Sequence, residues 1–505
     1  MRKILIQNWE QRPLRLILLL ALFFRLLAVV FSKGYGMHDD HFLVIESSQS
    51  WVDGYDYNNW LPSSNGGKLN PSGHSFTYSG MHYFFFKALQ SIGITDPQVK
   101  MYFVRLIHAL LSLTVILFGF RIAQKEAGIK TARMAGILLA LYFFMPVLSV
   151  RNLVEVACTP FLLYATWIVI KNDERLPLWK WFAVGLLLGF AFNIRFQCIL
   201  FAGGFGLALL IRKKWLPAIV TGLGFLVCAG ALQGITDYFI WGHPFVEFKE
   251  YVRYNLENAR DYFSREWYMY FTVLAGILVP PISLFLLFGF FRSWRKYVLL
   301  FLPAFVFLAF HSYFPNKQER FILPIMPFVI TLGIIGWHEF VQRSAFWQKR
   351  QKLLRACWIF FWCVNFLPLC VLSVAYTKRS RVESMCYLAK KGDVHAYIVE
   401  GGNTDDEVLL PRFYLGKWRP EYYINNKITP AVLDSLLRSA EPGTLPDYVV
   451  FVTEENITQR VERLKKFYPR MKYEATIEPS FIDWLLHRLN PVNQNESSYI
   501  YRLDP

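Results

Sequence analysis

Long apolar runs recur along the first 376 residues and are separated by short polar stretches. A helix needs about 20 mostly apolar residues to cross a bilayer. Runs of roughly this kind lie at 14–31, 101–121, 133–150, 153–170, 179–193, 196–211, 216–240, 269–291, 297–314, 321–341 and 353–376. The pattern predicts about 11 transmembrane helices, and therefore an all-α polytopic membrane domain over residues 1–376.

Basic residues gather in every second connection between these runs. The basic connections are residues 2–15, 121–133, 171–180, 212–214, 292–296 and 343–355. Because Lys and Arg concentrate in cytoplasmic loops, these connections are expected to be cytoplasmic. The remaining connections, which are 32–100, 146–152, 193–196, 241–268, 312–320 and everything after 376, are then expected to be extracytoplasmic.

Two of the extracytoplasmic segments are long. In residues 32–100 we expect interfacial helices and an irregular Gly/Ser/Asn stretch at 63–73. From 377 to 505 the long apolar runs disappear and the charge rises. Residues 396–400 and 448–452 are typical of short buried strands, and 430–439 and 458–467 of amphipathic helices. The sequence therefore predicts a small extracytoplasmic α/β domain at the C-terminus.

Composition agrees with a membrane protein, since 54% of the residues are apolar and 18% are aromatic. The formal net charge of +17 would suggest a nucleic-acid partner in a soluble protein. Here the basic residues lie in the loops that set orientation, so we expect membrane lipids and no nucleic acid as partners. The cysteines show no paired spacing typical of metal sites.

The stretch His38-Asp39-Asp40-His41 lies just past the first apolar run. Ionisable residues at a membrane edge are costly and usually functional. A carboxylate beside a second carboxylate at a partly dehydrated surface tends toward a raised pKa, which suits a general base. We therefore take Asp40, with Asp39, as the candidate catalytic pair.

Two other interpretations of this stretch remain open. The carboxylates could cap a helix or pair with Lys33, as most isolated Asp-Asp pairs do. A divalent-cation site made by His38, Asp40 and Glu46 is the other alternative. No second ligand cluster supports it, so no metal is expected.

A second polar cluster lies in 311–321, between two apolar runs and on the same expected side as Asp40. Lys317 and Arg320 can make charge-assisted bonds to an anion, and the start of the next helix adds its dipole. Arg151 and Arg195 lie at other span ends on that side. An interfacial anchor is the alternative for each single cation, but the whole string favours phosphate binding.

Aromatic residues flank the extracytoplasmic segment 241–268. Asp237 and Trp241 precede it, and Trp267 and Tyr268 end it. Such aromatics are expected as an interfacial belt whatever the function. They would also suit stacking against a sugar.

The string Asn316-Lys-Gln-Glu-Arg-Phe-Ile-Leu-Pro-Ile-Met-Pro327 resembles the His-Lys-Glu-x-Arg-Phe-x-x-Pro-x-x-Pro signature of the C-type (GT-C) multispan glycosyltransferases of family 22. These are the dolichyl-phosphate-mannose-dependent mannosyltransferases of N-glycan and GPI-anchor assembly. Residues 38–41 occupy the place of the family's His-Pro-Asp-Glu-like motif, with His41 where the family has Glu. The likeness covers roughly residues 14–340.

The resemblance implies an inverting, metal-independent transfer of a sugar, most simply mannose, from a polyprenyl-phosphate donor to a hydroxyl of a glycan or glycolipid acceptor. It needs no cofactor. Asp40 would act as base, and Lys317, Arg320, Arg195 and Arg151 would bind the donor phosphate. The remaining expected substrate contacts are His38, His41, Glu319, Asp237, Trp241, Trp267 and Tyr268.

A transporter or flippase of a lipid-linked saccharide is the alternative function. It would favour charged residues at mid-bilayer and interrupted helices in matching halves, whereas the polar residues here gather at one face. A eukaryotic targeting signal is not evident, which favours a bacterial cytoplasmic membrane over the endoplasmic reticulum membrane.

Overall fold

The computed structural model describes residues 7–503 apart from 8, 65, 68–69, 173–175, 262–263, 404–406, 426, 438–443, 492 and 494. The basic residues Arg2, Lys3 and Arg175, and parts of the predicted segments 63–73 and 430–439, lie outside the described residues. The chain forms two compact units. We call residues 1–29, 58–81 and 104–373 the helical unit, and residues 30–57, 82–103 and 374–505 the mixed unit.

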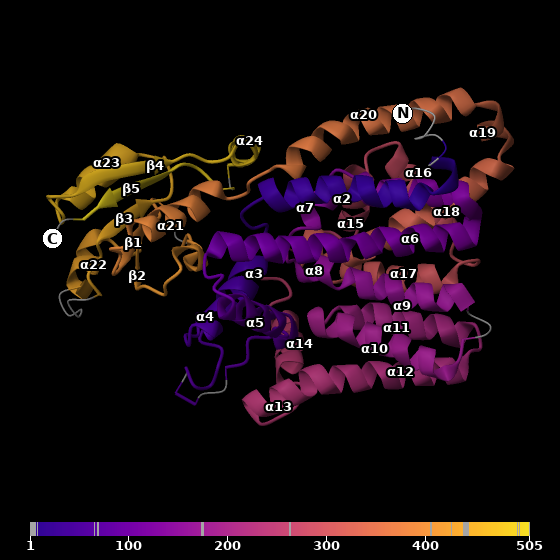
Figure 1. The fold of residues 1–505 in the computed structure, drawn as a ribbon, viewed down its shortest axis with the longest axis horizontal. Coiled ribbons are helices and arrows are strands. Elements are labelled where there is room, and N and C mark those ends of the chain that lie inside the picture. Colours follow the sequence, from indigo (N-terminus) through magenta and orange to yellow (C-terminus); the bar gives the residue numbers. More distant parts are fainter. Residues whose placement is uncertain are drawn as a thin grey trace. The chain divides into compact units, whose positions relative to one another are not determined.

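The long helices of the helical unit run in nearly one direction (Figure 1). The helices are α2 (Pro13–Phe31), α6 (Pro97–Leu141, which begins in the mixed unit), α7 (Phe144–Leu148), α8 (Val154–Ala157), α9 (Thr159–Asn172), α10 (Leu178–Ile194), α11 (Cys198–Ile211), α12 (Trp215–Ala229), α13 (Ile235–Trp241), α14 (Val246–Glu257), α15 (Met269–Ile277), α16 (Ile282–Arg292), α17 (Val298–Tyr313), α18 (Met326–Arg343), α19 (Ala345–Lys349) and α20 (Gln351–Ser373). A π-helical turn (Gly230–Gly234) joins α12 to α13, and a 3-10 helix (Glu319–Ile325) precedes α18.

Each of the eleven predicted runs contains a helix. Among the described residues, six helical stretches are long and apolar enough to cross a membrane, and four more apolar helices are shorter. The element α6 consists of two helices that meet at Gly128, inside the predicted connection 121–133. The φ of 81° and ψ of 176° at Gly128 are open to glycine and costly for other residues.

Glycines allow two pairs of helices to approach closely. A Cβ on Gly185 of α10 would lie 2.1 Å from the carbonyl oxygen of Thr221 in α12. A Cβ on Gly289 of α16 would lie 2.0 Å from the carbonyl oxygen of Gly333 in α18. Small residues at helix contacts are a general feature of membrane bundles, because they bring backbones together without a side chain between them.

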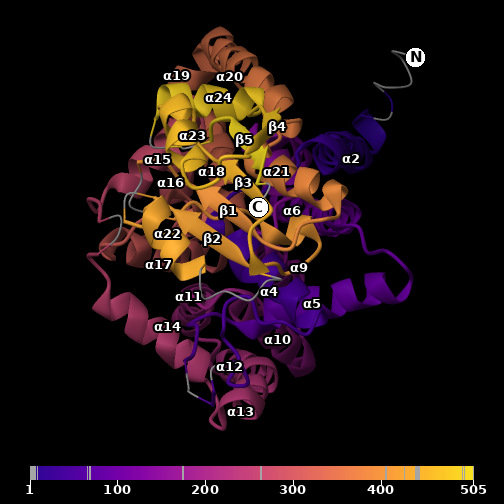
Figure 2. The same cartoon turned by 90° about the vertical axis from the view of Figure 1, so that its left-hand side faces the viewer.

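The mixed unit contains a five-stranded sheet with the order β2-β1-β3-β5-β4 (Figure 2). The strands are β1 (Tyr397–Glu400), β2 (Glu421–Ile424), β3 (Tyr448–Phe451), β4 (Lys472–Ile477) and β5 (Ser498–Arg502). Strand β1 is parallel to β2 and β3, whereas β5 is antiparallel to β3 and β4. The two strands predicted from sequence are β1 and β3, and both are wholly buried.

Helices α21 (Arg379–Lys391), α22 (Pro430–Leu437) and α23 (Ile457–Lys465) pack on this sheet. A further helix, α24 (Phe481–Leu489), has mostly exposed apolar side chains. Leu433 of α22 and Leu464 of α23 pack with Ile398, Val449 and Phe451 of the central strands. The predicted small α/β domain is therefore present, with α22 and α23 at the positions that the amphipathic patterns indicate.

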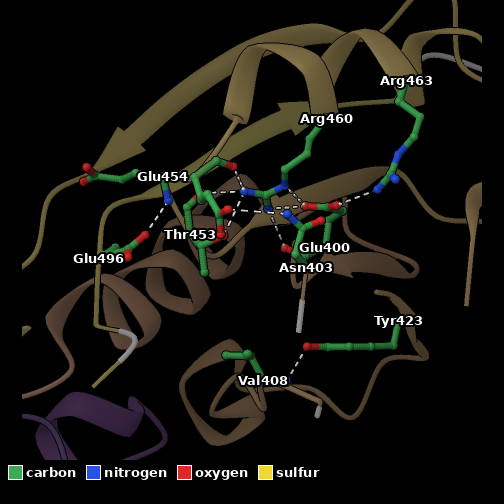
Figure 3. Close-up of polar contacts among 10 residues, drawn as sticks. Glu400, Asn403, Val408, Tyr423, Thr453, Glu454, Arg460, Arg463 and Glu496 are labelled. Carbon is green, nitrogen blue, oxygen red and sulfur yellow. Dashed lines mark hydrogen bonds and ion pairs between the residues drawn. The ribbon is translucent and has the colours of Figure 1, made fainter. Parts of the chain in front are cut away.

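The carboxyl ends of β1 and β3 form a topological switch point, where many α/β folds bind ligands. Here a buried guanidinium fills the position (Figure 3). Arg460 donates through Nε to Glu400 at 2.8 Å and through Nη1 to the carbonyl and hydroxyl oxygens of Thr453, each at 2.8 Å. The cluster is part of the domain's core.

The first part of the mixed unit is one almost continuous helical segment. It comprises α3 (His38–His41), a π-helical turn (Phe42–Glu46) and α4 (Ser47–Val52). A later helix, α5 (Phe76–Ser91), crosses from the helical unit into the mixed unit. The mixed unit thus contains residues 30–57 and 82–103 together with the C-terminal residues. The boundary predicted at 376 assigns residues 30–57 and 82–103 to the membrane domain instead. That boundary stays a prediction.

Candidate functional site

Arg195 and Glu155 form a deeply buried ion pair in the helical unit. Arg195 follows α10 in an extended conformation, and its Nη1 is paired with Oε1 of Glu155 in α8. Their side chains are 3% and 1% exposed. Within the described part of the chain, Nε and Nη2 of Arg195 have no hydrogen-bond partner. Because buried polar groups are normally bonded, these two donors are suited to an external anion.

Arg320 adds a second cation to this pair. Its Nε lies 3.9 Å from Oε1 of Glu155 and donates to Oε1 of Gln318 at 2.8 Å. The ring of Phe321 lies 5.5 Å from the guanidinium carbons of both Arg195 and Arg320. Two guanidinium groups thus lie beside one carboxylate. Part of the string 316–327 and two distant helix ends are brought together here.

Lys317 has a different environment. Its Nζ donates to the carbonyl oxygens of Arg265, at 2.9 Å, and of Phe314. Burial lowers the pKa of Lys317, and nearby Glu266 partly offsets this effect. The backbone N–H of Arg265 also donates to Pro315. Lys317 therefore holds two loops together and keeps at most one N–H for a substrate.

The aromatic residues predicted as sugar contacts differ in exposure. Trp267 is 65% exposed and lines an open cleft of about 710 Å³ with Lys317, and Tyr268 is also exposed. Glu319 is exposed at the start of the 3-10 helix. Trp241 is buried at the end of α13, and among the described atoms its indole nitrogen has no hydrogen-bond partner. Arg151 is buried in the turn between α7 and α8.

Asp237 belongs to a buried network. Its carboxylate accepts from Nε2 of Gln233 at 2.8 Å and from the backbone N–H of Glu247 at 3.0 Å. It therefore caps α14 at the first turn, which is a structural role that its sequence position does not reveal.

Glu247 is a buried carboxylate that the sequence reasoning missed. Its Oε2 accepts from the backbone N–H groups of Gly73, at 2.6 Å, and His74, at 3.2 Å. Burial raises the pKa of Glu247 to about 7, although these hydrogen bonds and that of Ser72 oppose the shift. The only local signal was an acidic residue in the first turn of an amphipathic helix, which is usually a surface feature.

In the mixed unit, the Asp39-Asp40 pair lies in α3. The Asp40 side chain is buried, and its two oxygens accept from the backbone N–H groups of Gly36, at 3.0 Å, and Met37, at 2.7 Å. Asp39 is half-buried. His38 is exposed and stacks on Phe42 at 4.7 Å between ring centroids. Asp40 therefore has the capping contacts that the alternative interpretation expected, and they fix its orientation.

His41 is held between aromatic rings and an acid. It stacks against Tyr35, at 4.8 Å, and Tyr414, at 5.5 Å, and its Nε2 lies 3.1 Å from Oε1 of Glu46. Both oxygens of Glu46 also accept from the backbone N–H of Phe413, at 3.0 and 2.9 Å. His41 and Glu46 thus fasten the first loop to the C-terminal residues inside this unit.

A metal site does not form from these groups. Glu46 bonds to His41 and Phe413, and Asp40 bonds to backbone amides. Among the residues that the structure describes, no three His, Cys, Asp or Glu side chains are grouped so as to hold a metal ion. The cation site that the spacing of His38, Asp40 and Glu46 left open is thus not seen.

Comparisons with known proteins define the family. Residues 16–393 match the model of the Alg9-like mannosyltransferase family. Mannosyltransferase APTG1 of Arabidopsis thaliana is 23% identical over 416 residues, which are 76% of this chain and 73% of that protein. Two solved structures are similar at low identity. ArnT from Cupriavidus metallidurans, bound to undecaprenyl phosphate, matches over 97% of both chains with a TM-score of 0.60 and 12% identity.

The second structure is the archaeal oligosaccharyltransferase AglB from Archaeoglobus fulgidus, in complex with an inhibitory peptide and a dolichol-phosphate. It matches over 88% of this chain and 70% of that chain, with a TM-score of 0.50 and 10% identity. The fold is that of the GT-C membrane glycosyltransferases, and the chain is a multi-pass membrane protein. Since the family model spans most of its length, the chain belongs to the Alg9-like mannosyltransferase family. The family resemblance and the mannosyltransferase class predicted from sequence are confirmed.

Proposed function

We propose that this mannosyltransferase takes mannose from a polyprenyl-phosphate donor and transfers it, with inversion and without a metal, to a hydroxyl of a lipid-linked glycan or another acceptor. Solved GT-C structures bound to undecaprenyl phosphate and dolichol-phosphate support a lipid phosphate as the donor class. Membership of a mannosyltransferase family favours this reaction over the transporter alternative.

The observation that carries the proposal is the unfilled bonding capacity of Arg195. Its Nε and Nη2, which have no partner among the described residues, form with the neighbouring Arg320 a site for an anion in a buried setting, where hydrogen bonds to charge are strong. The departing polyprenyl phosphate gains negative charge as the sugar leaves, so these cations stabilise the transition state more than the ground state. Arg151 and the remaining N–H of Lys317 are secondary candidates for the same phosphate.

The proton is taken by the Asp39-Asp40 pair, with Asp40 preferred by its position in the family motif. The acceptor hydroxyl oxygen attacks the anomeric carbon, the bond from that carbon to the phosphate oxygen breaks, and the aspartate receives the hydroxyl proton. The hydrogen bonds that the backbone N–H groups of Gly36 and Met37 donate orient the Asp40 carboxylate. Asp39, which is less buried, is the alternative base.

The other predicted contacts divide by environment. His38, Glu319, Trp267 and Tyr268 are exposed and keep the role of sugar or lipid contacts. Asp237, Trp241 and His41 are buried and are proposed to position the substrate loops. The active site and C-terminal domain are proposed to be extracytoplasmic from the alternation of basic loops, with a bacterial cytoplasmic membrane favoured over the endoplasmic reticulum.

The test is a donor panel. The purified protein is incubated with mannosyl and glucosyl polyprenyl phosphates and with nucleotide-linked mannose, in the presence of glycolipids from its own membranes. We expect only the mannosyl polyprenyl phosphate to be consumed, with release of polyprenyl phosphate. Use of the nucleotide sugar instead would overturn the donor assignment, and use of the glucosyl lipid would overturn the sugar.

A further inference from the structure

The mixed unit contains a pocket of about 180 Å³ that no role described so far explains. It is lined by α4, the end of α5, the start of α6 and residues 412–418. At its base, Nζ of Lys100 donates to Oε1 of Gln49 at 2.8 Å, and both side chains are buried. At its rim lie the exposed residues Asp53, Gln90 and Thr95.

One wall of the pocket is aromatic and held rigidly. Nε1 of Trp418 donates to Oδ2 of Asp53 at 2.9 Å, and its ring stacks on Tyr55 with 5.5 Å between centroids. The other oxygen of Asp53 accepts from Nε2 of Gln49 at 3.0 Å. The indole and the carboxylate are therefore fixed before any ligand arrives, which lowers the entropy cost of binding.

The polar groups of the pocket are mixed donors and acceptors. The cations Lys100, Arg412 and Lys417 only donate, the carboxylate of Asp53 only accepts, and the amide of Gln90 and the hydroxyl of Thr95 do both. Sugar hydroxyls also donate and accept, and the C–H face of a pyranose packs on an aromatic ring. Arg412 is paired with Glu421. The carboxylate of Asp53 adds an acceptor that a sugar hydroxyl can use and an anion cannot.

The pocket is connected to the candidate base. Phe413, which lines it, is bonded through its backbone N–H to Glu46, and Glu46 pairs with His41, the neighbour of Asp40 in α3. Gln49 and Asp53 continue the same helical segment from α3 through the π-helical turn. Such turns are often found at functional sites.

We propose that this pocket binds a pyranose of the acceptor glycan, a role that rests on the proposed transfer reaction. Trp418 stacks on the sugar ring, and Asp53 and Gln90 bond its hydroxyls. The occupant places the acceptor chain so that another of its hydroxyls reaches the aspartate pair.

The first test measures sugar binding without donor, by calorimetry on the full-length protein in detergent. The probes are an α-linked mannotriose, a methyl glucoside and a methyl N-acetylglucosaminide. We expect saturable binding of at least one probe that weakens at least tenfold in Asp53→Asn and in Trp418→Ala. Trp484→Ala, which removes an exposed tryptophan of α24 in the same unit, should leave binding unchanged.

The second test uses transfer kinetics. Gln90→Ala, at the exposed rim and therefore safe for folding, should raise the KM for acceptor several-fold and leave the KM for donor unchanged. The proposal that this pocket binds the acceptor sugar would be refuted if Gln90→Ala left the acceptor KM unchanged and Trp418→Ala left probe binding unchanged. Competition between inorganic phosphate and the sugar probe would also refute it. Because the binding test contains no donor, sugar binding by a protein that fails the donor panel would refute the proposed reaction and leave the pocket standing.

Discussion

The guanidinium of Arg195 is buried against the carboxylate of Glu155, and the pair uses only Nη1 of the arginine among the described contacts. Burying charges is expensive, and replacing such a pair by apolar residues is often neutral or stabilising. Stability alone is therefore a poor explanation for a buried pair in which Nε and Nη2 of the arginine have no hydrogen-bond partner among the described residues. Arg320 adds a second cation, with its Nε 3.9 Å from the same carboxylate oxygen.

The first prediction follows from this pair. Arg195→Gln should lower kcat/KM for the lipid donor about 100-fold, as loss of one transition-state donor commonly does. Arg195→Lys should recover only part of this, because an ammonium cannot reproduce the two-pronged geometry. The measurement is steady-state transfer at saturating acceptor.

Arg253→Gln is the matched control. This arginine is exposed on α14 and paired with Glu250 and Glu257, so its loss should change stability little and leave transfer unchanged. Equal donor kinetics in Arg195→Gln and Arg253→Gln would refute the phosphate role of Arg195.

The second prediction concerns pH. Glu247 has a native pKa of about 7 against an ordinary value of 4.5, so between these pH values the native protein holds a proton that the unfolded chain has released. The contribution of Glu247 to the free energy of unfolding must therefore fall as pH rises through that range, by up to about 3 kcal/mol. Thermal unfolding of the wild type at pH 5 and pH 8 measures the fall.

Glu247→Gln keeps the shape of the protonated acid and cannot ionise. The variant should show a smaller loss of Tm between pH 5 and pH 8 than the wild type. If both proteins lose the same Tm over this range, Glu247 is ionised at neutral pH and its buried environment is more polar than described.

The third prediction tests the close helix contact. Gly185→Ala would place a methyl group 2.1 Å from a backbone oxygen of α12, so the helices must separate, at a cost of about 1–3 kcal/mol. Gly222→Ala on α12 meets no atom within 4 Å and should be neutral or stabilising by up to about 1 kcal/mol. The measurement is the Tm of each variant, which should be lower for Gly185→Ala than for Gly222→Ala. Equal Tm values would contradict the close contact between α10 and α12 at Gly185.

Much of the fold could be predicted from the sequence, because apolar runs and buried strands leave strong periodic signals. The helix positions and strands β1 and β3 were found in this way. Strands β4 and β5 were not, because β4 (Lys472–Ile477) begins with exposed charged residues and neither is a continuous apolar run. The break at Gly128 falls inside the connection 121–133 that the sequence predicts.

The site was only partly predictable for a related reason. Arg195 and Arg320 could be suspected from their places at span ends, but their shared partner Glu155 depends on tertiary packing. The motif predicts that Lys317 binds the donor phosphate, yet its Nζ donates to the carbonyl oxygens of Arg265 and Phe314. Glu247 had only the weak signal of an acidic residue in a first helical turn, because its partners are Ser72 and the backbone amides of residues 73–74, which are distant in sequence.

The most direct test of the central claim compares the wild type with Asp40→Asn and Asp39→Asn. Each protein, checked for an unchanged Tm, is given mannosyl polyprenyl phosphate of known anomeric configuration and its acceptor, and the product is examined by NMR. We predict a product of opposite configuration from the wild type, and a rate at least about 100-fold lower in Asp40→Asn. Retained configuration, or full activity in both variants, would contradict the account.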